Sequence, residues 1–400
     1  VAGIDTLVGS SAADRVTLTE AQTVTVAALD SLTGSASRES VTVTGDASVT
    51  IAAIDSIAGA GTGESLRVDL SGGATTTAAN VDLIVGTTAA DRITLNGGGS
   101  VTVAALDSLT GSSAAEHVQL SGASVLRQLA DIDTLVGSTG NDSVTISAAS
   151  TITMAAIETI TGHAASERVH LSGGGTVSTS KVDVLVGGAA ADHVTVTAAQ
   201  TGAFYNLLGG ADSLALAAGT NNVTVANVET VTGGTGTDTV TLGGLSSQTL
   251  TLAAVESLVG SAQRDDVTLA TGGAVTVGAL ETLTGSTGAD NESLSGAATM
   301  TVGALETITG SEQAVERVVL ASGGWTALQA AGIDVLVAAA SGADDVTLTA
   351  AQTSGIVNLL FGSDRLTLAD GTNILSTYNV ETVTGGSGAD SITIGGSQRT

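Results

Sequence analysis

A repeat of about 25 residues runs through the whole chain, and this repeat limits the possible folds more than any other feature. Each unit opens with an aliphatic residue followed by an acid, as in Ile4-Asp5, Leu29-Asp30 and Ile54-Asp55. The units that begin at Leu207 and Leu359 are shorter than the others, and the 400 residues hold 16 units without a linker. Self-similarity at such a period is typical of solenoids.

Each unit contains three short segments in which apolar and polar residues alternate. Val16 and Leu18 alternate with Thr17, a turn follows, and Val24 and Val26 then alternate with Thr25. Alternation of this kind, rich in β-branched residues, predicts half-buried strands. We therefore expect an all-β, parallel β-solenoid of about 16 stacked coils, each of about 25 residues with three short strands. The crossover rule for parallel strands favours a right-handed solenoid.

The composition agrees with a narrow aliphatic core. Aromatic residues make up 1% of the chain, Pro and Cys are absent, and Gly occurs 53 times. The formal net charge is −28, which argues against a nucleic acid as partner because few basic groups could neutralise phosphates. No apolar stretch reaches the length of a membrane span. The absence of Cys excludes disulfides.

A longer period indicates block duplication. Residues 197–244 match residues 349–396 without a gap, at an offset of 152. We expect residues 1–400 to form a single continuous solenoid and to be a fragment of a longer repeat protein. Its six-coil super-repeat covers residues 182–332 and, in part, 333–400.

Two sets of acidic residues hold most of the negative charge. The first set consists of the second residue of each full unit: Asp5, Asp30, Asp55, Asp82, Asp107, Asp133, Glu158, Asp183, Glu229, Glu256, Glu281, Glu306, Asp334 and Glu381. The second set follows nine or ten residues later: Asp14, Glu39, Glu64, Asp91, Glu116, Asp142, Glu167, Asp192, Asp238, Asp265, Asp290, Glu316, Asp344 and Asp390. If equivalent residues stack, each set forms a column of like charges. Hydrogen bonds from the backbone N–H groups of tight turns, neighbouring bases such as Arg92 and Arg264, or bound divalent cations could offset the repulsion.

The stretch between the two acids resembles the calcium-binding nonapeptide of RTX (hemolysin-type) proteins, G-G-x-G-x-D-x-U-x. Residues 233–238 and 385–390 match the G-G-x-G-x-D core, and residues 137–142 and 285–290 match with Ser at the second glycine. In that family such turns stack into a parallel β-roll with calcium between stacked turns and occur twice per coil of 18 residues, whereas in this chain the turn occurs once in 25 residues. The resemblance implies Ca²⁺ at a few turns, with these residues at the sites: Gly233, Gly234, Gly236, Asp238, Gly385, Gly386, Gly388, Asp390, Asp133, Gly137, Gly140, Asp142, Gly285, Gly288 and Asp290. Most other turns have lost the glycines.

One acid breaks the alternation, because Glu292 takes the inward place that Val16 has in its own unit. No Ser/His/Asp arrangement stands out, so we expect no catalysis. The leading hypothesis is an extracellular structural or adhesive protein that forms a rod, stalk, surface layer or filament. It would be secreted or displayed on a bacterial surface by type I-like secretion, self-associate end to end or laterally, and contact cell-surface or matrix components.

Two alternative functions stay open. Binding to ice or another crystal surface would use Thr-x-Thr rows at Thr23–Thr25, Thr151–Thr153, Thr249–Thr251 and Thr299–Thr301. A polysaccharide-active β-helix enzyme is the second alternative, and the uniform short turns and scarce aromatic residues argue against it.

Overall fold

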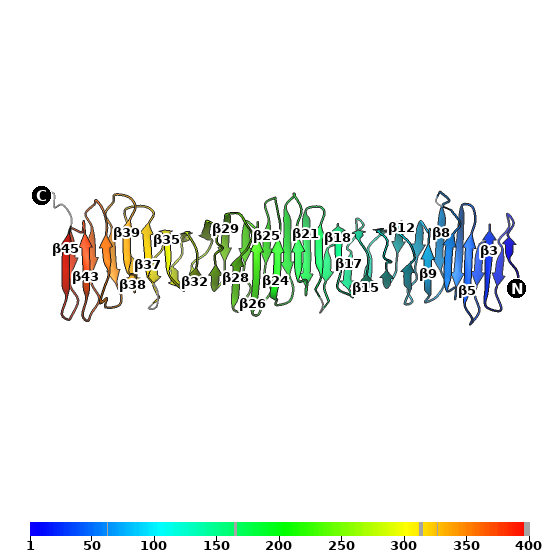
Figure 1. Ribbon diagram of the computed structural model, residues 1–400, viewed down its shortest axis with the longest axis horizontal. Coiled ribbons are helices and arrows are strands. Elements are labelled where there is room, and N and C mark those ends of the chain that lie inside the picture. Colours follow the sequence, from blue (N-terminus) through cyan, green and yellow to red (C-terminus); the bar gives the residue numbers. More distant parts are fainter. Residues whose placement is uncertain (62, 164–165, 312–314, 326, 396–400) are drawn as a thin grey trace. The chain divides into compact units, whose positions relative to one another are not determined.

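The computed structural model describes residues 1–61, 63–163, 166–311, 315–325 and 327–395. Every regular element in these residues is a β-strand, and there are 45 strands. The chain divides into two compact units, Val1–Val194 and Thr195–Thr400, and β23 (Asp192–Val196) spans the division. Within each unit the strands are stacked side by side in chain order (Figure 1).

In both units each strand pairs in parallel with the strand two places later in the chain. Odd-numbered strands therefore form one sheet, the odd sheet, and even-numbered strands form the other, the even sheet.

The odd sheet of unit 1 contains β1 (Thr6–Val8), β3 (Gln22–Ala27), β5 (Glu39–Val43), β7 (Ser56–Gly59), β9 (Thr75–Ala79), β11 (Arg92–Leu95), β13 (Ser108–Thr110), β15 (Val125–Ala130), β17 (Ser143–Ile146), β19 (Thr159–Thr161) and β21 (Gly175–Ser180). Its even sheet contains β2 (Arg15–Thr17), β4 (Ser31–Thr33), β6 (Ala47–Ala52), β8 (Leu66–Leu70), β10 (Leu83–Val85), β12 (Gly99–Ala104), β14 (Glu116–Leu120), β16 (Thr134–Val136), β18 (Thr151–Ala155), β20 (Arg168–Leu171) and β22 (Val184–Val186).

The even sheet of unit 2 contains β24 (Thr201–Asn206), β26 (Asn221–Ala226), β28 (Asp238–Leu242), β30 (Ser257–Val259), β32 (Gly273–Gly278), β34 (Asp290–Leu294), β36 (Thr307–Thr309), β38 (Leu328–Ala331), β40 (Asp345–Leu348), β42 (Arg365–Thr367) and β44 (Thr382–Thr384). Its odd sheet contains β25 (Ser213–Ala215), β27 (Thr230–Thr232), β29 (Gln248–Ala253), β31 (Asp265–Leu269), β33 (Thr282–Thr284), β35 (Ala298–Gly303), β37 (Glu316–Leu320), β39 (Val335–Ala338), β41 (Ile356–Asn358), β43 (Ile374–Tyr378) and β45 (Ser391–Gly395).

The predicted parallel β-solenoid is confirmed, but its turns differ from the prediction. A turn has two strands and about 17 residues, so the 22 strands of each unit in the described residues make 11 turns. The prediction of 16 coils, each made of one whole repeat with three strands, was therefore wrong. A repeat fills one and a half turns, and two repeats fill three. All three segments of a repeat have the same inward and outward alternation, so the pattern does not determine which segment stacks on which.

The interior consists of aliphatic columns that run from turn to turn. In unit 1, Val24, Val41 and Ile57 lie in register on neighbouring strands and are at most 1% exposed. The outward positions carry hydroxyl residues, as where Thr25 lies beside Thr42. This arrangement explains the predicted alternation, since β-branched residues fit a pleated, half-buried surface.

Glycines allow neighbouring turns to approach closely at the corners of the stack. The corner residue Ala28 has a φ of 49°, and its carbonyl oxygen would lie 1.9 Å from a Cβ placed on Gly9. The same contact recurs between Gly34 and Ala53 at 1.9 Å. These distances are too short for any nonbonded contact between carbon and oxygen, so the backbone of the next turn requires glycine at these two corners.

Candidate functional site

Buried carboxylates join one turn to the next, and they are the most regular polar feature of the molecule. Asp142 is 1% exposed and directly precedes β17. Its Oδ2 accepts the Ser138 N–H at 2.6 Å within its own turn, and its Oδ1 accepts the Ser124 N–H at 2.8 Å from the preceding turn. Asp91 repeats this pattern with Thr87 and Ala74. The second acidic set therefore caps turns through backbone hydrogen bonds, one of the explanations that the sequence left open.

The first acidic set meets the second set one turn later. The Asp142 N–H donates to Oε2 of Glu158 at 2.7 Å, and the Asp238 N–H donates to Oε2 of Glu256 at 2.7 Å. We call such a contact, in which the backbone of one acid binds the carboxylate of the other, an acid pair. The structure thus brings the two predicted sets together, with one member of each acid pair from each of two consecutive repeats.

Consecutive members of the first set do not stack on one another. Asp30 precedes β4, Asp55 precedes β7, and Asp82 precedes β10, so successive members lie at strands of alternating sheets. The continuous columns expected from the sequence are therefore divided into pairs. The physical reason is the two-strand turn, which places equivalent segments of neighbouring repeats in opposite sheets.

Some acids of the second set keep one buried carboxylate oxygen without a hydrogen-bond partner. Oε1 of Glu116 accepts the Ser112 N–H at 2.9 Å and is also within hydrogen-bond contact of the Ser112 hydroxyl. Oε2 of Glu116 is buried without a hydrogen-bond partner, and the same holds for Oε2 of Glu39. Burial, together with the neighbouring Asp183, raises the pKa of Glu167 to about 7. Asp344, an aspartate of the same set, also has one buried oxygen without a partner, so the length of the side chain alone does not explain the unsatisfied oxygens.

Arginine residues contribute little to holding these buried acids. Arg264 is next to Asp265 in the sequence, but its Nε lies 3.5 Å from Oδ1 of Asp266. The pairs Arg67–Asp69 and Arg127–Asp107 also contain no member of the second set. Hydrogen bonding, rather than ion pairing with arginine, therefore holds the second set.

The turns that resemble calcium sites use their carboxylates in the same way. Oδ2 of Asp238 accepts the Gly234 N–H at 2.7 Å, and its Oδ1 accepts from Nδ2 of Asn221 at 2.6 Å. Asp390 likewise accepts from Asn373 at 2.7 Å. Both oxygens of Asp238 already face N–H donors, so this arrangement does not fit a calcium ion coordinated through them.

The glycines of these turns allow neighbouring turns to approach closely, because a Cβ at these positions would clash with a backbone carbonyl oxygen. A Cβ on Gly233 would lie 1.7 Å from the Ala254 carbonyl oxygen, and one on Gly236 would lie 2.2 Å from that of Gly219. In the other two turns, Cβ atoms on Gly137 and Gly285 would lie 1.7 and 1.9 Å from carbonyl oxygens of the next turn.

The structure provides no further support for a metal site at these turns. In the described part of the chain, no three His, Asp or Glu residues are grouped so that they could hold a metal ion. The predicted calcium binding stays untested, and the hydrogen bonds of Asp238 argue against it.

Glu292 is the most unusual acid of the structure. It is 1% exposed, lies between Val275 and Ile308 on neighbouring strands, and neither carboxylate oxygen has a hydrogen-bond partner. Burial, together with the charges of Asp290 and Glu306, raises the pKa of Glu292 to about 8. The inward position predicted from the sequence is confirmed, and the side chain is predominantly a neutral carboxylic acid at neutral pH.

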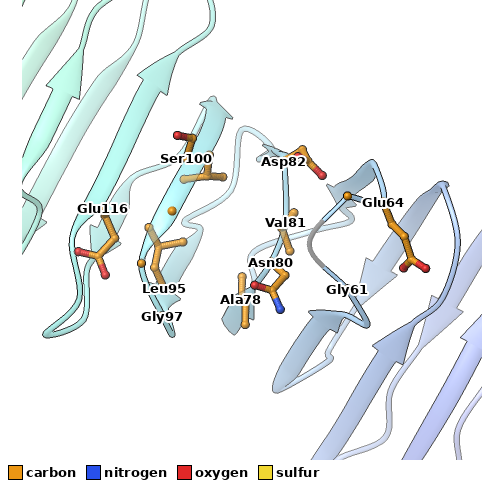
Figure 2. Close-up of a pocket in the computed structure, with 15 residues that line it drawn as sticks. Gly61, Glu64, Ala78, Asn80, Val81, Asp82, Leu95, Gly97, Ser100 and Glu116 are labelled. Carbon is orange, nitrogen blue, oxygen red and sulfur yellow. The ribbon is translucent and has the colours of Figure 1, made fainter.

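A groove of about 330 Å³ lies on unit 1, where glycine and alanine leave space between turns. Glu64 and Glu116 lie on opposite sides of this groove, with Asn80 and Asp82 between them (Figure 2). Oδ2 of Asp82 accepts the Leu66 N–H at 2.8 Å, so this carboxylate also joins neighbouring turns. The acids of the groove do not converge on one point, and the groove therefore does not form a general acid–base pair.

The Thr-x-Thr motifs do not make one row, because Thr151–Thr153 lies on β18 of an even sheet and the other three motifs lie on odd sheets. Other strands nevertheless complete a threonine array on the odd sheet of unit 2. Its first column, in register on four neighbouring strands, contains Thr230, Thr251, Thr268 and Thr284. A parallel column contains Thr249, Asp266, Thr282 and Thr301.

Comparisons with protein-family models, curated proteins and solved structures find no match to this chain. In the described residues, no helix is long and apolar enough to cross a membrane.

Proposed function

We propose that the chain is an extracellular structural or adhesive repeat protein without catalytic activity. The observation that carries this proposal is the repeated acid pair, which joins successive turns by hydrogen bonds in both units. Each buried acid fixes its own turn and the neighbouring turn at the same time. Such an arrangement resists local unfolding, as a load-carrying or spacing element requires.

Relatedness to RTX proteins is part of this proposal. The two-strand turn of about 17 residues supports it, since two nonapeptides of that family also make one coil. Secretion or display on a bacterial surface, in a stalk, a surface layer or a filament, follows from the same resemblance. Contacts to cell-surface or matrix components belong to the adhesive form of the role.

Mechanical unfolding of single molecules tests this role. We expect the chain to resist force and then unfold in steps of a few turns, and alanine at Asp142 and Asp238 should lower the unfolding force. Thr241→Ala, which changes a half-buried outward residue on β28, is the matched control and should leave the force unchanged. A chain that extends at negligible force would contradict the structural role.

A second candidate function is binding to a regular crystalline surface, such as ice, through the threonine array. Its hydroxyls repeat at the strand spacing of about 4.8 Å along each column. Lysine at Thr251 and Thr284 should abolish any inhibition of ice recrystallisation, and lysine at Thr276 of the even sheet should not. Wild-type protein that leaves ice growth unchanged would rule out this function.

A further inference from the structure

One outward face of unit 2 is apolar, in contrast to the hydroxyl-rich faces elsewhere. The apolar face lies on β37, β39, β41 and β43 of the odd sheet. It consists of Val319, Val335, Val337, Ile356, Ile374 and Tyr378, and the polar outward residues Asn358 and Ser376 lie among them. Ile356, Ile374 and Tyr378 are 40%, 48% and 37% exposed.

Two residues of the apolar face, Ile374 and Tyr378, are not needed for the stacking of turns, as the duplicated block indicates, although Ile356 corresponds to another apolar residue, Phe204. Ile374 corresponds to Asn222, and Tyr378 corresponds to Ala226, at the offset of 152 residues. Asn222 is exposed on β26, and that strand stacks between its neighbours without an apolar residue at this place. The outward residues of β43 therefore differ from those of β26 for a reason other than stacking.

The charge distribution favours contact at this face. The chain carries a net charge of −28, yet the outward positions of these four strands carry no acid. Their one charged outward residue is Arg317, which lies beside Val335. Two acidic molecules can approach each other here without bringing carboxylates together, and Arg317 can face acidic edges of the other molecule.

We propose that the apolar face is the contact by which a second copy of this chain packs, sheet against sheet, on the odd sheet of unit 2. Sheets with aligned strands pack about 10 Å apart. A two-fold arrangement would place each apolar face against its equivalent. This inference deepens the proposed structural role by naming the surface of lateral association.

The area of the face determines how far the contact extends. Four strands at about 4.8 Å spacing, with about five residues of roughly 3.3 Å each, cover roughly 300 Å². A stable interface buries about 800 Å² on each partner. The contact must therefore continue along the odd sheet onto the outward columns of β27 to β35, where threonines and one acid, Asp266, would form a polar rim beside the apolar centre.

Sedimentation equilibrium of the 400-residue chain tests the inference. We expect concentration-dependent dimers, and higher salt should strengthen them because it screens the repulsion between acidic chains. Replacing Ile374→Asn and Tyr378→Ala restores the residues of the first block and should raise the dissociation constant at least tenfold. The melting temperature should stay unchanged, because the same residues occur on β26. Ile356→Lys, as a second variant, should have the same effect on dimerisation.

The matched control is Val259→Asn, which changes an exposed apolar residue on the even sheet. This variant should dimerise like the wild type. A wild type that stays monomeric at high concentration and salt would overturn the inference but not the mechanical role. Equal dimerisation of the wild type and the face variants would also overturn it, since the contact would then lie elsewhere.

Discussion

The two copies of the duplicated block, residues 197–244 and 349–396, share their internal hydrogen bonds and differ on their outer surface. Asn221 and Asn373 are fully buried, and each donates from Nδ2 to a carbonyl oxygen four residues earlier at 2.8 Å. The outward residues differ, as Asn222 and Ile374 illustrate.

The copies also lie in opposite sheets, with β26 in the even sheet and β43 in the odd sheet. The block is therefore tolerated in either sheet as long as its turn chemistry is kept. The two copies therefore indicate that the contacts between turns determine the fold, whereas the outward residues can change without changing it.

Replacing a glycine at which two turns approach closely should cause the largest loss of stability. Gly233→Ala would place a Cβ 1.7 Å from the Ala254 carbonyl oxygen, and we expect a loss of about 3 kcal/mol in stability. Thermal and urea unfolding measure this loss. Gly209→Ala, which introduces no contact within 4 Å, is the control. Equal losses at Gly233 and Gly209 would contradict the close approach of turns.

Replacing a buried asparagine should cause the second-largest loss of stability. Asn221→Ala removes the hydrogen bonds to Ala217 and Asp238 and the one that Oδ1 accepts from the Gln200 N–H. Asn373→Ala removes the same three bonds, and each variant should lose about 2 kcal/mol. Asn222→Ala changes an exposed neighbour and should lose less than about 0.5 kcal/mol. If Asn221 and Asn222 proved equally tolerant, the shared hydrogen bonds would not define the block.

Glu292 occupies the inward place that Val240 and Ile392 take in the two copies of the block, so it shows what a carboxyl group at this place does to stability. Its pKa is raised to about 8 in the folded chain, from 4.5 as the ordinary value. The folded state therefore holds the proton more tightly than the unfolded state. The stabilising contribution of this proton is fully present below pH 4.5 and is lost as the pH rises to about 8.

Glu292→Val should accordingly stabilise the chain by about 1 kcal/mol at pH 6 and by more at pH 8. Melting curves of both proteins across this pH range give the difference, and subtraction removes the contribution of the other acids. A wild-type-minus-variant difference that does not change with pH would show that Glu292 titrates normally.

Adding calcium should have the smallest effect on the stability of the chain. The carboxylate oxygens of Asp238 accept N–H donors in the first copy, and Oδ1 of Asp390 accepts from Asn373 in the second. We expect titration calorimetry at millimolar calcium to detect no binding and the melting temperature to stay constant. Heat that disappears in the Asp238→Ala, Asp390→Ala double variant would instead establish the sites that the RTX resemblance implies.

Much of the fold follows from local patterns in the sequence. The alternation of Val24 and Val26 with Thr25 predicts both the strand and its inward face, and the inward place of Glu292 follows from the same alternation. The number of strands per turn does not follow from the sequence pattern, because all three segments of a repeat have the same alternation of apolar and polar residues. That number depends on which segments face each other across the core, which is a long-range property.

The acidic sets were found by their spacing, but their pairing depended on the turn. The spacing alone could not place Asp142 beside Glu158 of the next repeat, since that contact requires a turn of about 17 residues. The unsatisfied Oε2 of Glu116 could not be predicted either, because it depends on which donors the folded turn places near the carboxylate. The asparagine contacts of Asn221 also had no signal in the alternation.

Disulfide cross-linking distinguishes a two-strand turn from a three-strand turn, and it is feasible because the chain has no cysteine of its own. Thr251 and Thr268 are register partners on β29 and β31. Thr251 and Thr276 occupy the same place in two successive repeats, yet they lie on β29 and β32 in opposite sheets. We predict rapid oxidation of a Thr251→Cys, Thr268→Cys protein and no intramolecular disulfide in Thr251→Cys, Thr276→Cys. The reverse result would contradict the two-strand turn and would indicate a turn made of one whole repeat with three strands.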